Sequence, residues 1–165
     1  RVLGRGESEL DLQRVATELT VVVSTSVSDF TPSTQTPVAA LESLQSNLAL
    51  RWCRKLLVFD RVPSSEEIGE MRRDARAFRD VTRGAKWLST WNSKRDDYEA
   101  YCEALRAMKE ANHPALLNVE LVFLPRFGHL LGTVREAFEH LATRYVFVTQ
   151  HDLRLSGKFV AADVQ

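Results

Sequence analysis

The sequence predicts an α/β fold with three layers, α/β/α, around a mostly parallel sheet. Four apolar, β-branched runs recur along the chain, and helical segments separate them. Polar residues follow directly after three of these runs. The alternation favours parallel strands joined by right-handed crossovers, and the polar residues at the strand ends indicate a ligand site at the carboxyl edge of the sheet.

The first strand and the helix after it are expected between residues 19 and 50. Residues 1–18 are mixed and charged, which predicts an arm or a short leading helix. "LTVVVSTSV" (19–27) is typical of a strand buried on both faces. Thr36 is the expected N-cap of the next helix, with Pro37 at its first position.

The second strand is expected over residues 54–63, with an apolar core that stops at Asp60. Ser64 is placed to cap a charged helix. From about residue 68 to residue 112 the chain is polar and helix-rich, which indicates a helical insertion between the second and third strands. Trp87 and Trp91 lie four residues apart in it and could share a helical face.

The last two strands enclose one more amphipathic helix. The third strand is expected over 115–125, and the fourth ends in "YVFVTQHD" (145–152). Between them, spacing predicts a helix with one apolar face that would pack on the sheet. That face comprises Leu131, Val134, Phe138 and Leu141.

Composition excludes several classes of function. The 165 residues suit one domain, and 22 basic side chains balance 22 acidic ones, so no nucleic-acid partner is expected. No apolar run is long enough to predict a membrane span. The four histidines lack zinc-ligand spacing, and the two cysteines, Cys53 and Cys102, are expected to be semi-buried thiols.

Three common motifs are absent from the chain. It contains neither GxGxxG nor GxxxxGK[ST], the two glycine-rich phosphate cradles, and it has no GxSxG nucleophile elbow. A bound diphosphate would therefore need a metal ion or arginine side chains to balance its charge.

Two carboxylates at strand ends are candidate ligand contacts. Asp152 can bind a hard cation, Mg²⁺ or Mn²⁺, if the substrate supplies phosphate oxygens; otherwise it is a solvated side chain. Asp60 can accept hydrogen bonds from a nucleobase or a ribose, or can form a salt bridge with Arg61 or Arg54.

Two basic side chains near these ends also have two interpretations each. His151 could act as a general base or point away from the site. Arg135, on the helix before the fourth strand, could face a phosphate or be solvated.

Four segments together resemble the N-terminal, nucleotide-binding half of a GT-A-fold glycosyltransferase of the family-2 type. They are "LTVVVSTSV", "VAALESLQ", "KLLVFDRVPSS" and "FGHLLGTVREAFEHLATRYVFVTQHD". The resemblance implies a Rossmann-like GT-A sheet over residues 19–165. The family's Ala-Arg-Asn-like triplet falls on Thr133 to Arg135, and its Asp-x-Asp falls on Gln150 to Asp152.

The resemblance also implies residue roles and partners. Thr25 and Asp60 would contact the base of a UDP- or GDP-linked sugar, Gln150 the ribose, and Asp152 an Mn²⁺ or Mg²⁺ ion that holds the diphosphate. The acceptor, a glycan, lipid or protein, would bind to a further half after Gln165. That half would also contain the catalytic base. Gln150 replaces an acid of the family, Arg135 replaces an asparagine, and Ser24 replaces a proline.

Two other hypotheses remain at this stage. The first is a non-catalytic module of the same fold that binds a protein through the insertion around Trp87 and Trp91; the neutral Gln150 favours it. The second is a flavodoxin-like or other doubly wound domain that lacks a recognisable fingerprint.

Overall fold

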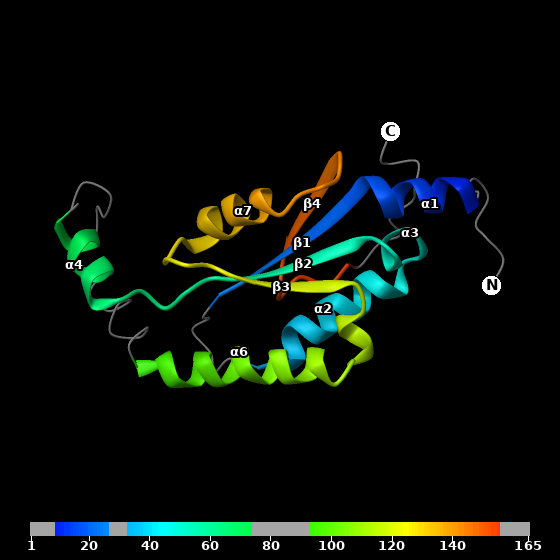
Figure 1. Cartoon of the computed structure of the whole chain (residues 1–165). Helices are drawn as coiled ribbons and strands as arrows, with labels where there is room; N and C mark the ends of the chain where they lie inside the picture. Colours follow the sequence, from blue (N-terminus) through cyan, green and yellow to red (C-terminus); the bar gives the residue numbers. More distant parts are fainter. Residues whose placement is uncertain (1–8, 27–32, 74–92, 156–165) are drawn as a thin grey trace.

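The computed structural model describes residues 9–26, 33–73 and 93–155 (Figure 1). In these ranges, strands alternate with helices along the chain. In order, the elements are α1 (Glu9–Glu18), β1 (Leu19–Thr25), α2 (Gln35–Ser46), α3 (Leu48–Arg51), β2 (Arg54–Phe59), α4 (Ser65–Arg73), α6 (Arg95–Glu110), the 3₁₀ helix η1 (Pro114–Leu116), β3 (Val119–Phe123), α7 (His129–Glu139) and β4 (Tyr145–Gln150).

The four strands form one sheet in the order β3-β2-β1-β4, and every neighbouring pair is parallel. All seven residues of β1 are buried, as expected for a central strand covered on both faces. The predicted α/β architecture with three layers and a Rossmann-like sheet is confirmed.

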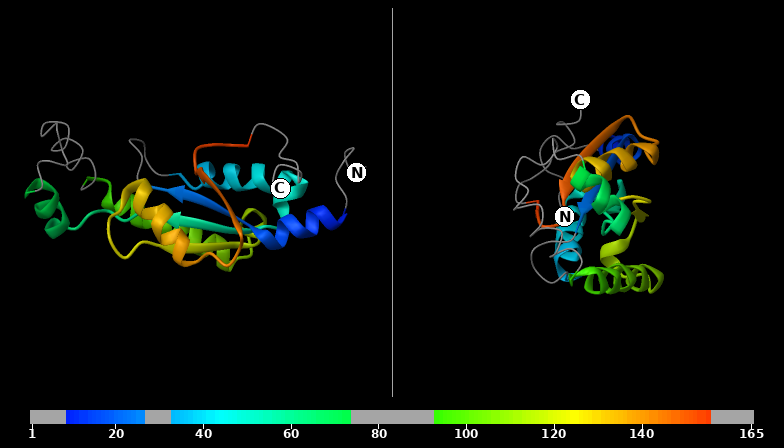
Figure 2. Two further views of the ribbon diagram at one scale, coloured as in Figure 1. Left: turned by 90° about the horizontal axis from the view of Figure 1, so that it is seen from above. Right: turned by 90° about the vertical axis from the view of Figure 1, so that its left-hand side faces the viewer.

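Helices cover both faces of the sheet (Figures 1 and 2). On one face, α2, α3 and α6 pack against the odd-numbered side chains of β1 and β2, including Val21, Val23 and Leu57. On the other face, Ala137 of α7 packs with Val22 and the even-numbered side chains of β2. The alternating direction of successive strand side chains thus assigns each strand residue to one layer.

Several element boundaries differ from the sequence prediction. Helix α2 begins at Gln35, and its N-cap, Thr34, makes no side-chain capping bond, so the expected cap at Thr36 is wrong. The expected third strand is shorter because η1 forms over its first residues. The predicted cap at Ser64 is confirmed, since the backbone N–H of Glu67 donates to its hydroxyl and the Glu67 carboxylate accepts from the Ser64 N–H.

The predicted apolar face of α7 is wrong at Leu131 and Phe138, whereas Leu141, just after the helix, packs against the sheet as expected. Leu131 is 83% exposed and Phe138 is 53% exposed, whereas the small side chains of Thr133 and Ala137 face the sheet. Short side chains let the helix approach closely, and a Cβ on Gly132 would lie 3.2 Å from a methyl group of Leu124.

The region expected to be an insertion contains α4 and α6. Helix α6 buries Tyr98, Tyr101, Cys102 and Leu105 against the sheet, so it forms part of a covering layer. Trp87 and Trp91 lie outside the described residues. Among the helices that the structure describes, none has the length and apolar character needed to cross a membrane.

Candidate functional site at the carboxyl edge of the sheet

Three strand ends meet at the carboxyl edge of the sheet. Thr25 pairs with Phe59, and Ser24 pairs with Gln150. Beyond the strands, the N–H of Asp60 donates to the Thr25 carbonyl at 2.9 Å, and the N–H of His151 donates to the Ser24 carbonyl at 2.9 Å. The structure therefore brings Thr25, Asp60 and Gln150 to one edge.

The last two residues of β1 point to opposite faces and hold opposite helices. The hydroxyl of Ser24 lies 2.7 Å from that of Thr133 in α7, and the hydroxyl of Thr25 lies 2.8 Å from that of Tyr101 in α6. Ser24 is 5% exposed and Thr25 is 1% exposed. Both hydroxyls are therefore already hydrogen-bonded within the protein, and their direct effect is to fix the helices at the edge.

Asp60 is a buried carboxylate that is half satisfied. Its Oδ1 accepts hydrogen bonds from the N–H of Arg61 at 2.8 Å and from the N–H of Gly128 at 3.0 Å. Its Oδ2 is buried and has no hydrogen-bond partner among the described residues. Burial raises the pKa of Asp60, while the backbone donors act in the opposite direction.

The expected salt bridges of Asp60 do not form. The Arg61 guanidinium donates to the carbonyl of Pro125, and Arg54 pairs with Glu120. The interpretation of Asp60 as a salt-bridge partner of either guanidinium is wrong, although its Oδ1 does accept from the backbone N–H of Arg61.

Two tyrosines of α6 form hydrogen bonds with residues at the carboxyl edge of the sheet. The hydroxyl of Tyr98 donates to the Asp60 carbonyl at 2.8 Å, and Tyr101 bonds Thr25 as described above. Burial raises the pKa of both phenols, so both hydroxyls stay protonated. Sequence reasoning missed them, although Tyr98, Tyr101, Cys102 and Leu105 follow the i, i+3, i+4, i+7 spacing of a buried helical face.

The residues that end β4 are more accessible. Gln150 and Asp152 are exposed. His151 is half-buried, and its Nδ1 lies 3.3 Å from the Ser24 carbonyl, which fixes the orientation of the ring. An amide and a carboxylate are thus exposed to solvent at the same edge of the sheet as the buried Asp60, with β1 between them.

Arg135 does not lie among the polar residues at the carboxyl edge of the sheet. It is exposed and lies two positions from both Thr133 and Ala137, the residues of α7 that face the sheet. Because each helical residue turns by about 100°, its side chain projects from the far side of the helix.

A metal ion at this edge would depend on few protein ligands. In the described ranges, no three His, Cys, Asp or Glu side chains form a group that could hold an ion. Asp152 is a single accessible carboxylate, and Gln150 can offer a neutral oxygen. This donor set fits a hard cation that keeps water ligands and takes its remaining oxygens from a bound diphosphate.

Comparisons with models of known protein families, with curated proteins and with solved structures find no match to this chain. A parallel sheet of this kind hosts many unrelated activities. The functional argument therefore rests on the side chains at the carboxyl edge.

Proposed function

We propose that this chain is the donor-binding domain of a metal-assisted glycosyltransferase. The donor is a UDP- or GDP-linked sugar that binds at the carboxyl edge of β1, β2 and β4. Parallel α/β sheets bind ligands at this edge, and the polar strand ends that it gathers are those expected from the resemblance to family-2 GT-A enzymes.

One observation carries the proposal, namely that the buried Oδ2 of Asp60 has no hydrogen-bond partner in the part of the chain that the structure describes. A buried acceptor without a donor costs free energy, so its retention calls for a reason. The ring N–H of uracil or guanine could donate a hydrogen bond to this oxygen. The hydrogen bonds that Asp60 makes to Arg61 and Gly128 hold the carboxylate in place before any ligand arrives.

The accessible residues after β4 would bind the rest of the donor. Gln150 can hydrogen-bond a ribose hydroxyl, and Asp152 would hold Mn²⁺ or Mg²⁺ together with the phosphate oxygens. When bound, the metal ion supplies positive charge that stabilises the departing nucleoside diphosphate. Thr25 supports this arrangement because its carbonyl accepts a hydrogen bond from the N–H of Asp60.

Isothermal titration calorimetry with UDP and with GDP, each with and without Mn²⁺, tests the proposal. We expect metal-dependent binding of one of them, weakened roughly tenfold or more by Asp152→Ala because a metal ligand is lost. Glu139→Ala, which removes an exposed acid from the end of α7, serves as the matched control and should leave affinity unchanged. Absence of binding by either nucleotide, with or without metal, would refute the proposal.

A second candidate function is a non-catalytic protein-binding module of the same fold. The neutral Gln150, where the family has an acid, favours it, because it adds no charge for a metal. This alternative predicts that Asp152→Ala has no effect, whereas Trp87→Ala and Trp91→Ala abolish binding of a protein partner.

A further inference from the structure

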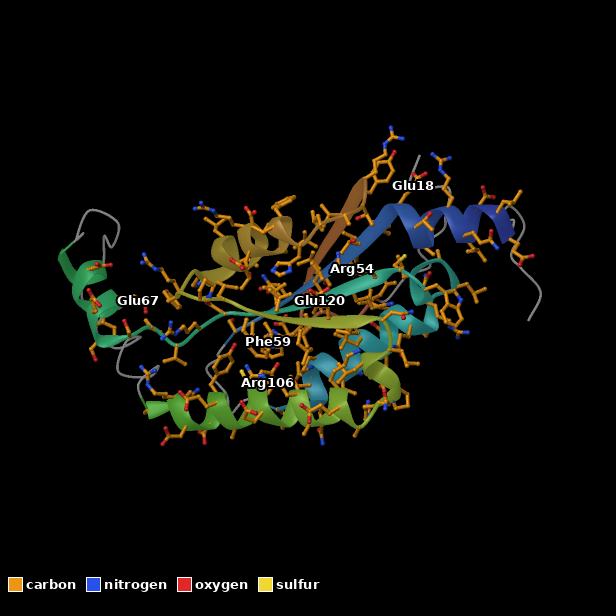
Figure 3. All side chains as sticks on the ribbon, in the orientation of Figure 1. Glu18, Arg54, Phe59, Glu67, Arg106 and Glu120 are labelled. Carbon is orange, nitrogen blue, oxygen red and sulfur yellow. The ribbon has the colours of Figure 1, made fainter. Side chains whose placement is uncertain are left out.

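A hollow of about 370 Å³ lies at the opposite end of the sheet, where β2 and β3 begin. It is built from α1 and from the segments that enter β2 and β3; Figure 3 labels two of its residues, Arg54 and Glu120. Its lining residues are Ala16, Trp52, Arg54, Asn118, Val119 and Glu120. The N–H of Lys55 donates to the Asn118 carbonyl at 2.8 Å, which holds the two entering segments together.

Trp52 is the largest apolar side chain among the residues that line this hollow. Its side chain follows α3 and is 64% exposed, although tryptophan is among the residues that are most buried on average. Ala16 also lines the hollow, whereas Val119 lies at its wall but is only 2% exposed. An exposed indole next to a hollow offers a flat surface on which a ring can stack.

The polar side chains of the hollow are held in position, and their charges balance. Arg54 pairs with Glu120 and also donates to the His140 carbonyl, and His140 Nδ1 lies 3.4 Å from the other Glu120 oxygen. The hydrogen bond from Arg54 lowers the pKa of Glu120, which keeps this carboxylate ionised. Asn118 is exposed at φ 55° and presents its amide beside this pair.

We propose that this hollow binds one ring of a neutral saccharide. A sugar ring has an apolar face that can stack on Trp52 and a rim of hydroxyls that can both donate and accept. The guanidinium, carboxylate and amide groups of Arg54, Glu120 and Asn118 supply both complementary types of partner.

Charge and size select this class of ligand over others. Phosphorylated or cationic ligands gain little, because Arg54 and Glu120 neutralise each other. Purely apolar ligands would cover this ion pair and remove its contact with water without offering it new hydrogen bonds. The volume is near the lower end of the range of roughly 300–1,000 Å³ for small-molecule sites, which limits the ligand to about one ring.

The hollow is separate from the carboxyl edge. Arg54 and Asp60 lie six residues apart along β2, a distance of about 20 Å for an extended strand. A saccharide and a nucleotide could therefore bind at once. The inference goes beyond the proposed function and does not depend on it.

NMR titration with maltotriose, chitotriose and xylotriose tests the inference, with the indole N–H of Trp52 as the reporter in the natural protein and the backbone amides of Asn118 and Glu120 as reporters in every variant. We expect at least one trisaccharide to shift this signal with a millimolar dissociation constant. Trp52→Ala should weaken binding by about tenfold or more, and Trp52→Phe should restore part of it, because a smaller ring still stacks. Asn118→Gly should also weaken binding, since glycine keeps the positive φ and removes only the amide.

The controls locate the site and define its ligand class. Leu131→Ala removes another exposed apolar side chain, on α7, and should leave saccharide binding unchanged. Three results would overturn the inference. They are no shift with any trisaccharide at millimolar concentration, saccharide binding that survives Trp52→Ala, and a stronger effect of uridine than of the sugars on Trp52. Calorimetry with UDP and GDP is read separately, so that either site can fail alone.

Discussion

The carboxylate of Asp60 accepts a hydrogen bond from the backbone N–H of Gly128 at 3.0 Å, which ties the end of β2 to the start of α7. The second oxygen of the same carboxylate is buried and has no hydrogen-bond partner within residues 9–26, 33–73 and 93–155. In this side chain, Oδ1 has a structural role, and Oδ2 is the acceptor that the proposed nucleobase would use.

Asp60→Asn should separate these two roles. The amide oxygen can keep both backbone bonds, while the NH₂ group replaces the orphaned acceptor by a donor. Because the buried charge is removed, we expect a higher free energy of unfolding at neutral pH, measured by urea denaturation. Nucleotide affinity should fall, because a nucleobase N–H would then meet another donor.

The pH dependence of stability provides the control for Asp60→Asn. The pKa of Asp60 is raised in the folded state, so the folded protein binds more protons than the unfolded chain between the two pKa values. Stability of the natural protein should therefore fall as pH rises through this interval, and the variant should lack this component. A variant that is less stable at neutral pH would show that the charge itself supports α7.

Gly128→Ala should destabilise the protein by displacing α7. A Cβ at this position would lie 2.6 Å from the Gly132 backbone and 2.9 Å from a methyl group of Leu124. Overpacking of this kind costs about 1–3 kcal/mol. The readout is the free energy of unfolding from urea denaturation.

Gly69→Ala is the matched control for Gly128→Ala. A Cβ there meets nothing within 4 Å, and the residue lies inside α4. Alanine should raise stability by about 0.5–1 kcal/mol, because glycine loses more conformational freedom in a helix. If the two variants change stability equally, close packing of α7 is not the cause.

The two central strands, β1 and β2, could be predicted because they are buried on both faces. The run of apolar residues in β1 and the stop of β2 before Asp60 are local features, and parallel topology follows from the alternation with helices. The gathering of polar strand ends followed in turn from the parallel direction. These parts needed no knowledge of which helix packs where.

The helical layers were harder to predict because they depend on close approach. Periodicity selected the large residues Leu131 and Phe138 for the buried face of α7, whereas packing against the sheet uses Thr133 and Ala137. The contact of Tyr101 with Thr25 joins residues 76 positions apart, so no local pattern reveals it. The candidate site was thus predictable at the strand ends and not in the side chains that support them.

Thr25 and Tyr101 should show coupled effects on stability. Thr25→Val leaves the Tyr101 hydroxyl without this hydrogen-bond partner, and Tyr101→Phe does the same to the Thr25 hydroxyl. Each change should cost about 1–3 kcal/mol, and the double variant should cost less than the sum by about 1 kcal/mol. Urea denaturation of all four proteins gives this difference, and Thr25→Val combined with Tyr145→Phe should be additive. Additivity of the first pair would show that the hydroxyls do not interact in solution.

Lys55 should make stability rise with pH just above neutrality. It is fully buried, its Nζ donates to the carbonyls of Arg51 and Cys53, and burial lowers its pKa from 10.5 to about 8. Between these values the unfolded chain binds more protons, so the free energy of unfolding increases with pH. Alone, this group would contribute roughly 3 kcal/mol across the whole interval.

The buried thiols oppose this increase in the free energy of unfolding at higher pH. Burial raises the pKa of Cys53 and of Cys102 from 9.0 to about 11, so the folded state retains protons that the unfolded chain loses. Their contribution to stability falls between these values and opposes that of Lys55. The net increase should therefore appear between pH 8 and pH 9, at about 1 kcal/mol.

Lys55→Met tests this assignment. Urea denaturation at several pH values should show that the increase disappears, because the buried amine was its source. Lys109→Met is the matched control, since this lysine also donates to a backbone carbonyl, that of Leu116, but is only half-buried. Its pH profile should match that of the natural protein. An increase that persists in Lys55→Met would mean that another group is its source. The lowered pKa expected for Lys55, whose Nζ is bound to the carbonyl of Arg51 at the end of α3, would then be wrong.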